Sequence, residues 1–105
     1  MIKDIPTKAD FTKELSDAGD KLVVVDFYAQ WCGPCRMISP KIEEMSKVYT
    51  DVIFLKVDVD ENSDTAESES ISAMPTFKLY KNSKLVDELT GASEVKIKEL
   101  IEKHK

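Results

Sequence analysis

The sequence is poor in residues that mark several large classes of protein. Among 105 residues there are only 2 cysteines, 1 histidine, 3 glycines and 4 prolines. The cysteines, Cys32 and Cys35, are too few and too close in sequence for the disulfide framework of a small secreted domain. The low glycine and proline content excludes a collagen-like repeat and argues against disorder. The cysteine pair is therefore expected to perform chemistry and not to support the fold.

An excess of basic charge and a long apolar run are absent as well. The formal net charge is -5, so nucleic acid and acidic membrane surfaces would be repelled at long range. No stretch approaches the roughly 20 apolar residues that cross a bilayer, and the start Met1–Pro6 lacks the apolar core of a secretory signal. We expect a cytoplasmic protein, with the nucleus as an additional location, that binds neither nucleic acid nor membranes.

What is present is typical of one globular domain. Hydrophobic residues make up 42% and charged residues 33% of the chain. A chain of this length buries roughly two-thirds of its unfolded surface, which is sufficient for one core. Because no repeat, low-complexity tract or linker interrupts the sequence, we expect a single domain over residues 1–105.

The hydrophobic pattern of the first half predicts a helix, a strand and a second helix. Thr7 can cap a helix that ends at Gly19, and Pro34 suits the first turn of the next. Between them, Leu22–Ala29 is apolar on both faces apart from Asp26, as in a central strand covered on both sides. The apolar positions of the helices are Phe11, Leu15 and Ala18, then Ile38, Ile42, Met45 and Tyr49.

Several further residues are interpreted as structural. Pro40 should kink the second helix, and Met1 and Met37 are assigned to packing together with Met45. The acidic tract Asp58–Glu69 is interpreted as a solvated face.

The second half predicts a strand, a weakly helical stretch, a hairpin and a last helix. We expect these at Val52–Val59, at Glu61–Ser70, at Thr76–Tyr80 with Leu85–Leu89, and from Ser93 onward. Strands that alternate with helices imply right-handed crossovers and parallel pairing, while the hairpin adds antiparallel strands. The prediction is an α/β fold with a mixed sheet covered by helices on both faces.

The chemistry is expected where the first long strand leads into a helix, at Trp31–Cys35. Unpaired N–H groups and the macrodipole at a helix start favour an anion, so Cys32 can be an exposed thiolate nucleophile for disulfide exchange. Cys35 lies one turn further on and can displace a substrate captured at Cys32. Gly33 permits a tight turn, and Pro34 stiffens it.

A zinc site is the rival interpretation of two cysteines at this spacing. Zinc usually takes four ligands, and the chain offers no third cysteine and only His104, which we interpret as a solvated residue of the C-terminal tail. The ligand count favours redox chemistry.

The sequence strongly resembles the thioredoxin family over essentially the whole chain. The resemblance is carried by the residues from Val25 to Arg36, together with Pro40, Lys56–Asp58, Met74–Thr76 and Gly91–Ala92. The resemblance implies about five strands flanked by four helices. It also implies a monomer without bound cofactor or metal, in which an NADPH-dependent flavoprotein, thioredoxin reductase, reduces the Cys32–Cys35 disulfide. The dithiol then reduces proteins such as peroxiredoxins, methionine sulfoxide reductases and ribonucleotide reductase.

The resemblance further implies that Met74–Pro75 is a cis peptide beside the sulfurs and that the backbone there pairs with an extended substrate. Thr76, Gly91 and Ala92 are assigned to the same substrate-binding region. Their structural alternatives are a proline at a strand start and a glycine in a turn. This chain departs from the family at Ser83, where the hairpin usually carries glycine. It also has Asn62, Glu69 and Ala73 where animal relatives often carry extra cysteines, which disfavours disulfide-linked dimers.

Two neighbours of the cysteines have both a functional and a structural interpretation. Burial should raise the pKa of Asp26, so that it can exchange a proton with Cys35; the alternative is an inert acid paired with Lys56. Trp31 can shield the sulfurs and contact partners, or it can be part of the core.

Three functions remain open at this point. The first is a protein-disulfide reductase, and the second is a module that binds partners only in its dithiol state. The third is an oxidising or isomerising domain of a secretory compartment, which the absent signal sequence and the Gly33–Pro34 dipeptide disfavour.

Overall fold

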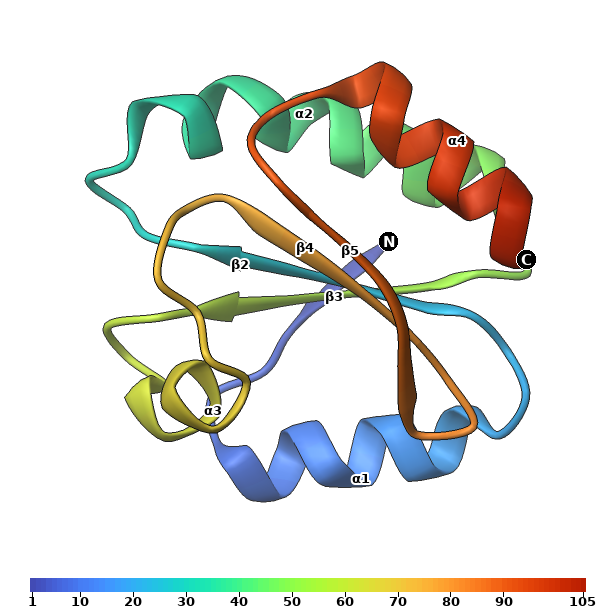
Figure 1. Cartoon of the computed structure of the whole chain (residues 1–105), viewed down its shortest axis with the longest axis horizontal. Coiled ribbons are helices and arrows are strands. Elements are labelled where there is room, and N and C mark those ends of the chain that lie inside the picture. Colours follow the sequence, from blue (N-terminus) through green and yellow to red (C-terminus); the bar gives the residue numbers. More distant parts are fainter.

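A five-stranded mixed sheet forms the middle layer of the computed structural model, which describes residues 1–105 (Figure 1). The elements in chain order are β1 (Ile2–Asp4), α1 (Lys8–Ala18), β2 (Val23–Tyr28), α2 (Gly33–Val48), β3 (Ile53–Asp58), α3 (Ser63–Ser68), β4 (Thr76–Lys81), β5 (Lys84–Thr90) and α4 (Glu94–His104). The expected mixed sheet of about five strands flanked by four helices is confirmed. None of the four helices combines the length and the apolar character needed to span a bilayer.

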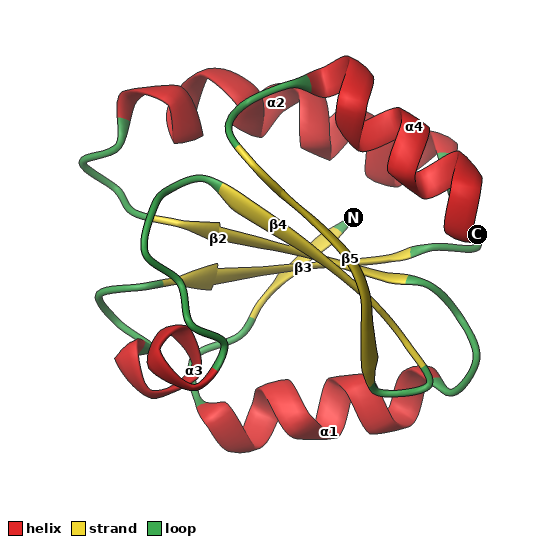
Figure 2. Cartoon of the chain, in the orientation of Figure 1, coloured by secondary structure: helices red, strands yellow, loops and turns green.

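The strands lie in the order β1-β3-β2-β4-β5. β1 and β2 run parallel to β3, whereas β4 runs antiparallel to both β2 and β5. Helices α2 and α4 cover one face of the sheet, and α1 and α3 cover the other (Figure 2). Strand β2 is central and pairs with β3 and β4. The start of α2, which follows the carboxyl end of β2, is therefore positioned by a strand that is hydrogen-bonded on both sides.

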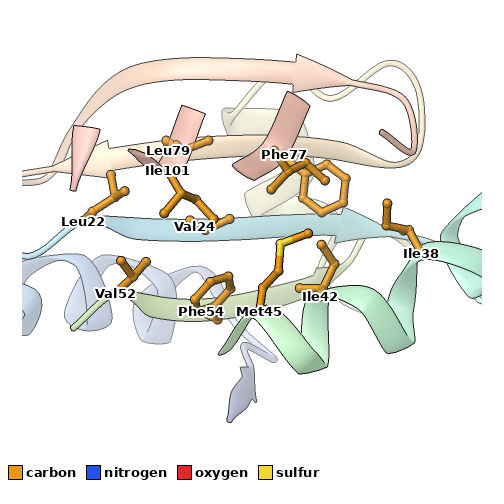
Figure 3. Close-up of a cluster of buried hydrophobic side chains, with 11 residues drawn as sticks. Leu22, Val24, Ile38, Ile42, Met45, Val52, Phe54, Phe77, Leu79 and Ile101 are labelled. Atoms are coloured by element: carbon orange, nitrogen blue, oxygen red, sulfur yellow. The ribbon is translucent and has the colours of Figure 1, made fainter. Parts of the chain in front are cut away.

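Alternation of side chains along β2 and β4 creates two apolar cores. Between the sheet and α2 with α4, the buried side chains include Val24, Ile42, Phe77 and Ile101 (Figure 3). The opposite core lies under α1 and contains Phe11, Val25, Phe27 and Tyr80. The two cores hold the central strands rigidly below the site.

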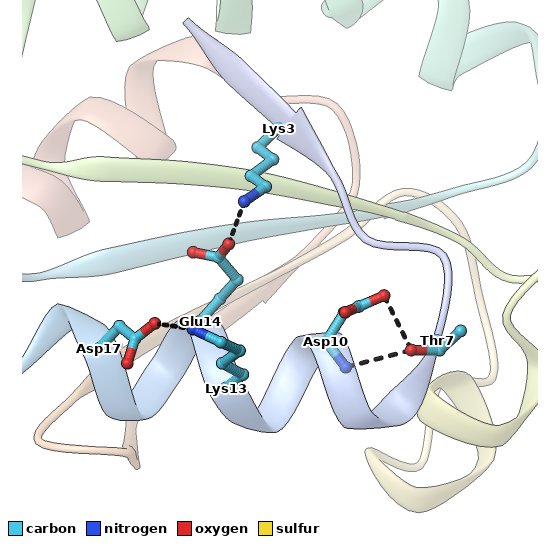
Figure 4. Close-up of polar contacts among 6 residues, drawn as sticks. All are labelled: Lys3, Thr7, Asp10, Lys13, Glu14 and Asp17. Carbon is cyan, nitrogen blue, oxygen red and sulfur yellow. Dashed lines mark hydrogen bonds and ion pairs between the residues drawn. The ribbon is translucent and has the colours of Figure 1, made fainter.

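The first helix confirms the predicted cap. The Thr7 side chain accepts a hydrogen bond from the backbone N–H of Asp10 at 3.1 Å, and the helix is followed by Gly19 at φ 59° (Figure 4). Strand β1 was not predicted from the hydrophobic pattern, because three residues are too short for periodicity. Pairing with β3 holds it in place, and Lys3 of β1 forms an ion pair with Glu14 of α1.

The hairpin between β4 and β5 turns at two residues in the left-handed region. Asn82 has φ 55° and Ser83 has φ 64°. Two consecutive residues with positive φ are typical of a type I′ turn, whose twist matches that of the strands. Ser83 therefore occupies a position that usually favours glycine.

Two packing predictions are wrong. Met1 and Met37 are both exposed, whereas Met45 is buried as expected. Met37 lies on the outward face of α2, one turn after Pro34, and a single apolar side chain carries no signal that separates an exposed face from a buried one. Pro40 lies inside α2, which continues to Val48.

Candidate functional site

Cys32 is the cap of helix α2. Its Sγ atom accepts a hydrogen bond from the backbone N–H of Cys35 at 3.2 Å, and its carbonyl accepts one from the N–H of Arg36 at 3.2 Å. Pro34 lies in the first turn, as predicted. An N–H group directed at a sulfur at the positive end of a helix would stabilise a thiolate there once the disulfide is reduced.

The two cysteines form a disulfide with their Cα atoms 5.3 Å apart. In this oxidised state Cys32 is only 5% exposed, so the expectation of an exposed sulfur is wrong here. The reason is local packing, because both cysteines cluster with Ala29 while Tyr28, Val59 and Met74 pack around them. Both cysteines are therefore almost fully covered in the oxidised state.

Trp31 lies outside the core. It is 67% exposed, and its Nε1 donates a hydrogen bond to Oδ2 of Asp60 at 3.0 Å. Asp60 in turn belongs to a turn held by Asp58, whose Oδ1 accepts the N–H of Asp60 at 2.9 Å. Asp58 is buried, so assigning the whole acidic tract to a solvated face is wrong at this residue. The indole is thus held beside the cysteines with an open face.

The predicted cis peptide Met74–Pro75 is confirmed. Met74 packs against the cysteine cluster, and Pro75 is buried. The N–H of Gly91 donates to the carbonyl of Pro75 at 2.9 Å, and Thr76 Oγ1 donates to the carbonyl of Ala73 at 2.7 Å. The structure therefore places Met74 against the cysteines and joins Gly91 and Thr76 to the same segment by hydrogen bonds.

Ala92 follows Gly91 in the short connection that leads to α4. It borders a groove of about 410 Å³ together with Pro34, Met37 and Glu94. The sequence interpretation missed Met37 as a site residue, although its position one turn after Pro34 places it on the same exposed face of α2. Trp31, Pro34 and Met37 give the region around the cysteines an exposed apolar border.

Asp26 lies beneath the cysteines. It is 6% exposed and lines a cavity of about 230 Å³ that Cys35 and Lys56 also line. Burial raises the pKa of Asp26 to about 7, against the opposing effect of the Lys56 charge. Its Oδ1 atom has no hydrogen-bond partner. A carboxyl group with this pKa beside Cys35 can take up or release a proton near neutral pH.

Lys56 does not form the ion pair with Asp26 that the structural alternative required. Its Nζ atom lies 3.9 Å from Oδ1 of Asp4 and 5.7 Å from the centre of the Tyr28 ring. The Tyr28 hydroxyl donates to the same Asp4 oxygen at 3.4 Å. Asp4 and Tyr28 carry no motif that the sequence interpretation could have used, because their contact depends on the unpredicted strand β1.

No group of three or more histidine, cysteine, aspartate or glutamate side chains is placed to hold a metal ion. His104 is not a solvated tail residue, since it is the last residue of α4 and its Nε2 lies 2.9 Å from Oδ2 of Asp87 on β5. This hydrogen bond joins the end of α4 to β5.

Comparison with known proteins agrees with this geometry. A family model described as Thioredoxin matches residues 3–103. A curated thioredoxin from Geodia cydonium is 59% identical over the full length of both chains, and the thioredoxin of Homo sapiens is 48% identical over 96% of each. The crystal structure of Fasciola hepatica thioredoxin superposes with a TM-score of 0.97 at 48% identity, covering 98% of this chain and 99% of the other.

Proposed function

This chain belongs to the thioredoxin family, and from that premise we propose that it reduces protein disulfides by cycling Cys32 and Cys35 between dithiol and disulfide. Membership of the family and the redox-active pair make it a thiol–disulfide oxidoreductase. The observation that carries the proposal is the position of Cys32, whose sulfur caps α2, with Cys35 one turn behind it at the Asp26 cavity.

Reduction of a target proceeds in two exchanges. The Cys32 thiolate attacks one sulfur of the target disulfide, and the other target sulfur leaves as a thiolate and takes up a proton. Cys35 then transfers its proton to Asp26 and attacks Sγ of Cys32. This step releases the second target sulfur and leaves the Cys32–Cys35 disulfide, so two electrons have passed to the target.

The target binds across the region that surrounds the cysteines. Trp31, Gly33 and Pro34 adjoin the two cysteines along the chain, and Met74 of the cis-proline segment packs against the cysteine cluster. We assign the backbone at Met74–Thr76 to pairing with an extended target segment, a mode in which main-chain hydrogen bonds supply affinity. Gly91 and Ala92 complete the surface, because Gly91 bonds to Pro75 and Ala92 borders the adjoining groove.

Recycling needs electrons from outside the chain. We propose that thioredoxin reductase, a flavoprotein that uses NADPH, reduces the disulfide and that no cofactor binds to this protein itself. Peroxiredoxins, methionine sulfoxide reductases and ribonucleotide reductase are the proposed targets. The proposed locations are the cytoplasm and the nucleus, because these compartments keep thiols reduced.

Insulin reduction coupled to NADPH oxidation tests this function. With a thioredoxin reductase present, the wild-type protein should oxidise NADPH continuously in the presence of insulin, and Cys32→Ser should not. A folded wild-type protein that binds partners only when Cys32 and Cys35 are reduced, but gives no turnover, would support the alternative of a redox-dependent binding module.

A further inference from the structure

Two buried side chains of β4 bind Glu69, the residue at which the connection from α3 to the Met74–Pro75 segment begins. Lys78 Nζ donates a hydrogen bond to the backbone carbonyl of Glu69 at 2.5 Å, and the hydroxyl of Tyr80 donates to Glu69 Oε1. Glu69 is the C-terminal cap of α3. It starts the connection that runs from α3 to Pro75.

Lys78 and Tyr80 are both buried, so their donor groups have few partners other than Glu69. Lys78 is 7% exposed, and its one charged partner is Glu88 of β5, at 3.5 Å. A buried ammonium group needs such partners, since desolvation without them is costly. Burial and the bond to Glu69 raise the pKa of Tyr80, so its hydroxyl remains a donor. Its ring packs edge-on against Phe11 with centroids 5.6 Å apart.

The connection is fastened at both ends. Near its start, the N–H of Ile71 donates to the carbonyl of Ala66 at 2.9 Å. At its end, Thr76 Oγ1 donates to the carbonyl of Ala73 at 2.7 Å, and Met74 packs on the cysteine cluster. Only the four residues 70–73 separate Glu69 from Met74, so a shift at Glu69 would be transmitted over a short segment.

We propose that Lys78 and Tyr80 are positioning residues, which hold the Met74–Pro75 segment through Glu69 so that the segment is preformed when a target docks. The proposal rests on the proposed function, in which that segment pairs with the target. A preformed segment lowers the ordering cost of binding. Loosening it should weaken the binding of proteins and leave the reaction of Cys32 with a small disulfide unchanged.

Tyr80→Phe is the main test, because it removes one hydroxyl and keeps the ring against Phe11. We expect its KM for insulin to rise about fivefold, the effect of losing roughly one hydrogen bond, with kcat within about twofold of wild type. The rate of reduction of the small disulfide 5,5′-dithiobis(2-nitrobenzoic acid) should not change. Amide hydrogen exchange at Ile71 should become faster.

Tyr49→Phe is the matched control, since Tyr49 is a half-buried tyrosine that follows α2 on the opposite face of the sheet. It should leave KM and exchange at Ile71 unchanged. Lys78→Met should repeat the effect of Tyr80→Phe, and Glu69→Gln should retain wild-type KM because an amide oxygen can still accept the Tyr80 bond. Urea unfolding confirms that each variant is folded.

Two results would overturn the proposal. One is an unchanged KM in folded Tyr80→Phe, and the other is an equal loss of activity on insulin and on the small disulfide. Failure of the proposed function is a separate result, because it would appear as absent insulin turnover in the wild-type protein itself.

Discussion

Asp26 and Lys56 are paired in register on the adjacent strands β2 and β3, yet the ammonium group of Lys56 pairs with Asp4 instead. The buried carboxyl is therefore left without a direct counter-charge. Burial outweighs the distant attraction of Lys56, and the pKa of Asp26 rises to about 7. Because Lys56 pairs with Asp4, Asp26 remains a proton acceptor with a pKa near neutral pH in the cavity that Cys35 also lines.

Asp26→Asn should stabilise the oxidised protein at high pH. Because the folded-state pKa of about 7 lies above the ordinary value of 3.8, the folded state binds more protons than the unfolded state between these limits. The contribution of Asp26 to wild-type stability is thus greatest below about pH 4 and falls as pH rises through 7, by on the order of 4 kcal/mol. Urea unfolding should show a gain for the variant at pH 8 and little change at pH 4; an equal gain at both values would contradict this.

The same variant should slow thiol–disulfide exchange near neutral pH. Without the carboxylate, Cys35 has no acceptor for its proton during the second exchange. Stopped-flow oxidation of the reduced protein by insulin should show the largest deficit around pH 7 and recovery at higher pH, where Cys35 ionises unaided. A pH–rate profile with the wild-type shape would remove Asp26 from the mechanism.

Changes at Asp4 and Lys56 should move the pKa of Asp26 in opposite directions. Asp4→Asn releases Lys56 to approach the carboxyl, which lowers the pKa of Asp26, whereas Lys56→Met removes the attraction and raises it. NMR titration of the Asp26 carboxyl carbon measures both shifts. Lys47→Met, at an exposed lysine in the last turn of α2, should have no effect. If the pKa of Asp26 shifted in the same direction in Asp4→Asn and Lys56→Met, the proposed competition of Asp4 with Asp26 for Lys56 would be refuted.

Cys35→Ser should accumulate mixed disulfides with target proteins, since no thiol remains to attack Sγ of Cys32. Non-reducing gel electrophoresis after incubation with oxidised insulin should show the adduct, and reductant should dissolve it. Cys32→Ser should form no such adduct through this site. Adduct formation by Cys32→Ser alone would reverse the two roles.

Ser83→Gly should stabilise the hairpin. Ser83 has φ 64°, a conformation that costs a side-chain-bearing residue about 1 kcal/mol and glycine little. We expect a gain of about 0.5–1 kcal/mol in the free energy of unfolding, measured by urea denaturation. Ser16→Gly, inside helix α1, should instead destabilise the protein. A loss of stability in Ser83→Gly would mean that the turn tolerates serine without strain.

The sequence predicted what depends on local pattern and missed what depends on distant contacts. The helix capped by Thr7, the buried strand around Asp26 and the cysteines at a helix start follow from spacing and residue type. The cis peptide at Pro75 came only from the family resemblance, because no local pattern encodes it.

The unpredicted features have a common cause. Strand β1 exists because β3 offers it an edge, and the contact of Asp4 with Lys56 depends on that pairing. The hold of Lys78 and Tyr80 on Glu69 joins residues from two elements that only the assembled sheet brings together. The exposure of Met37 likewise depends on which face of α2 packs against the sheet.

The Cys32–Cys35 bond spans a sequence separation of only three residues. In a chain-entropy view, a link that closes so small a ring restricts the denatured ensemble little and contributes about 2 kcal/mol, less than half of what a 100-residue ring would contribute. The native state is therefore held by its two apolar layers and not by sulfur. The molecule can break and remake its one covalent crosslink in every turnover while its architecture persists.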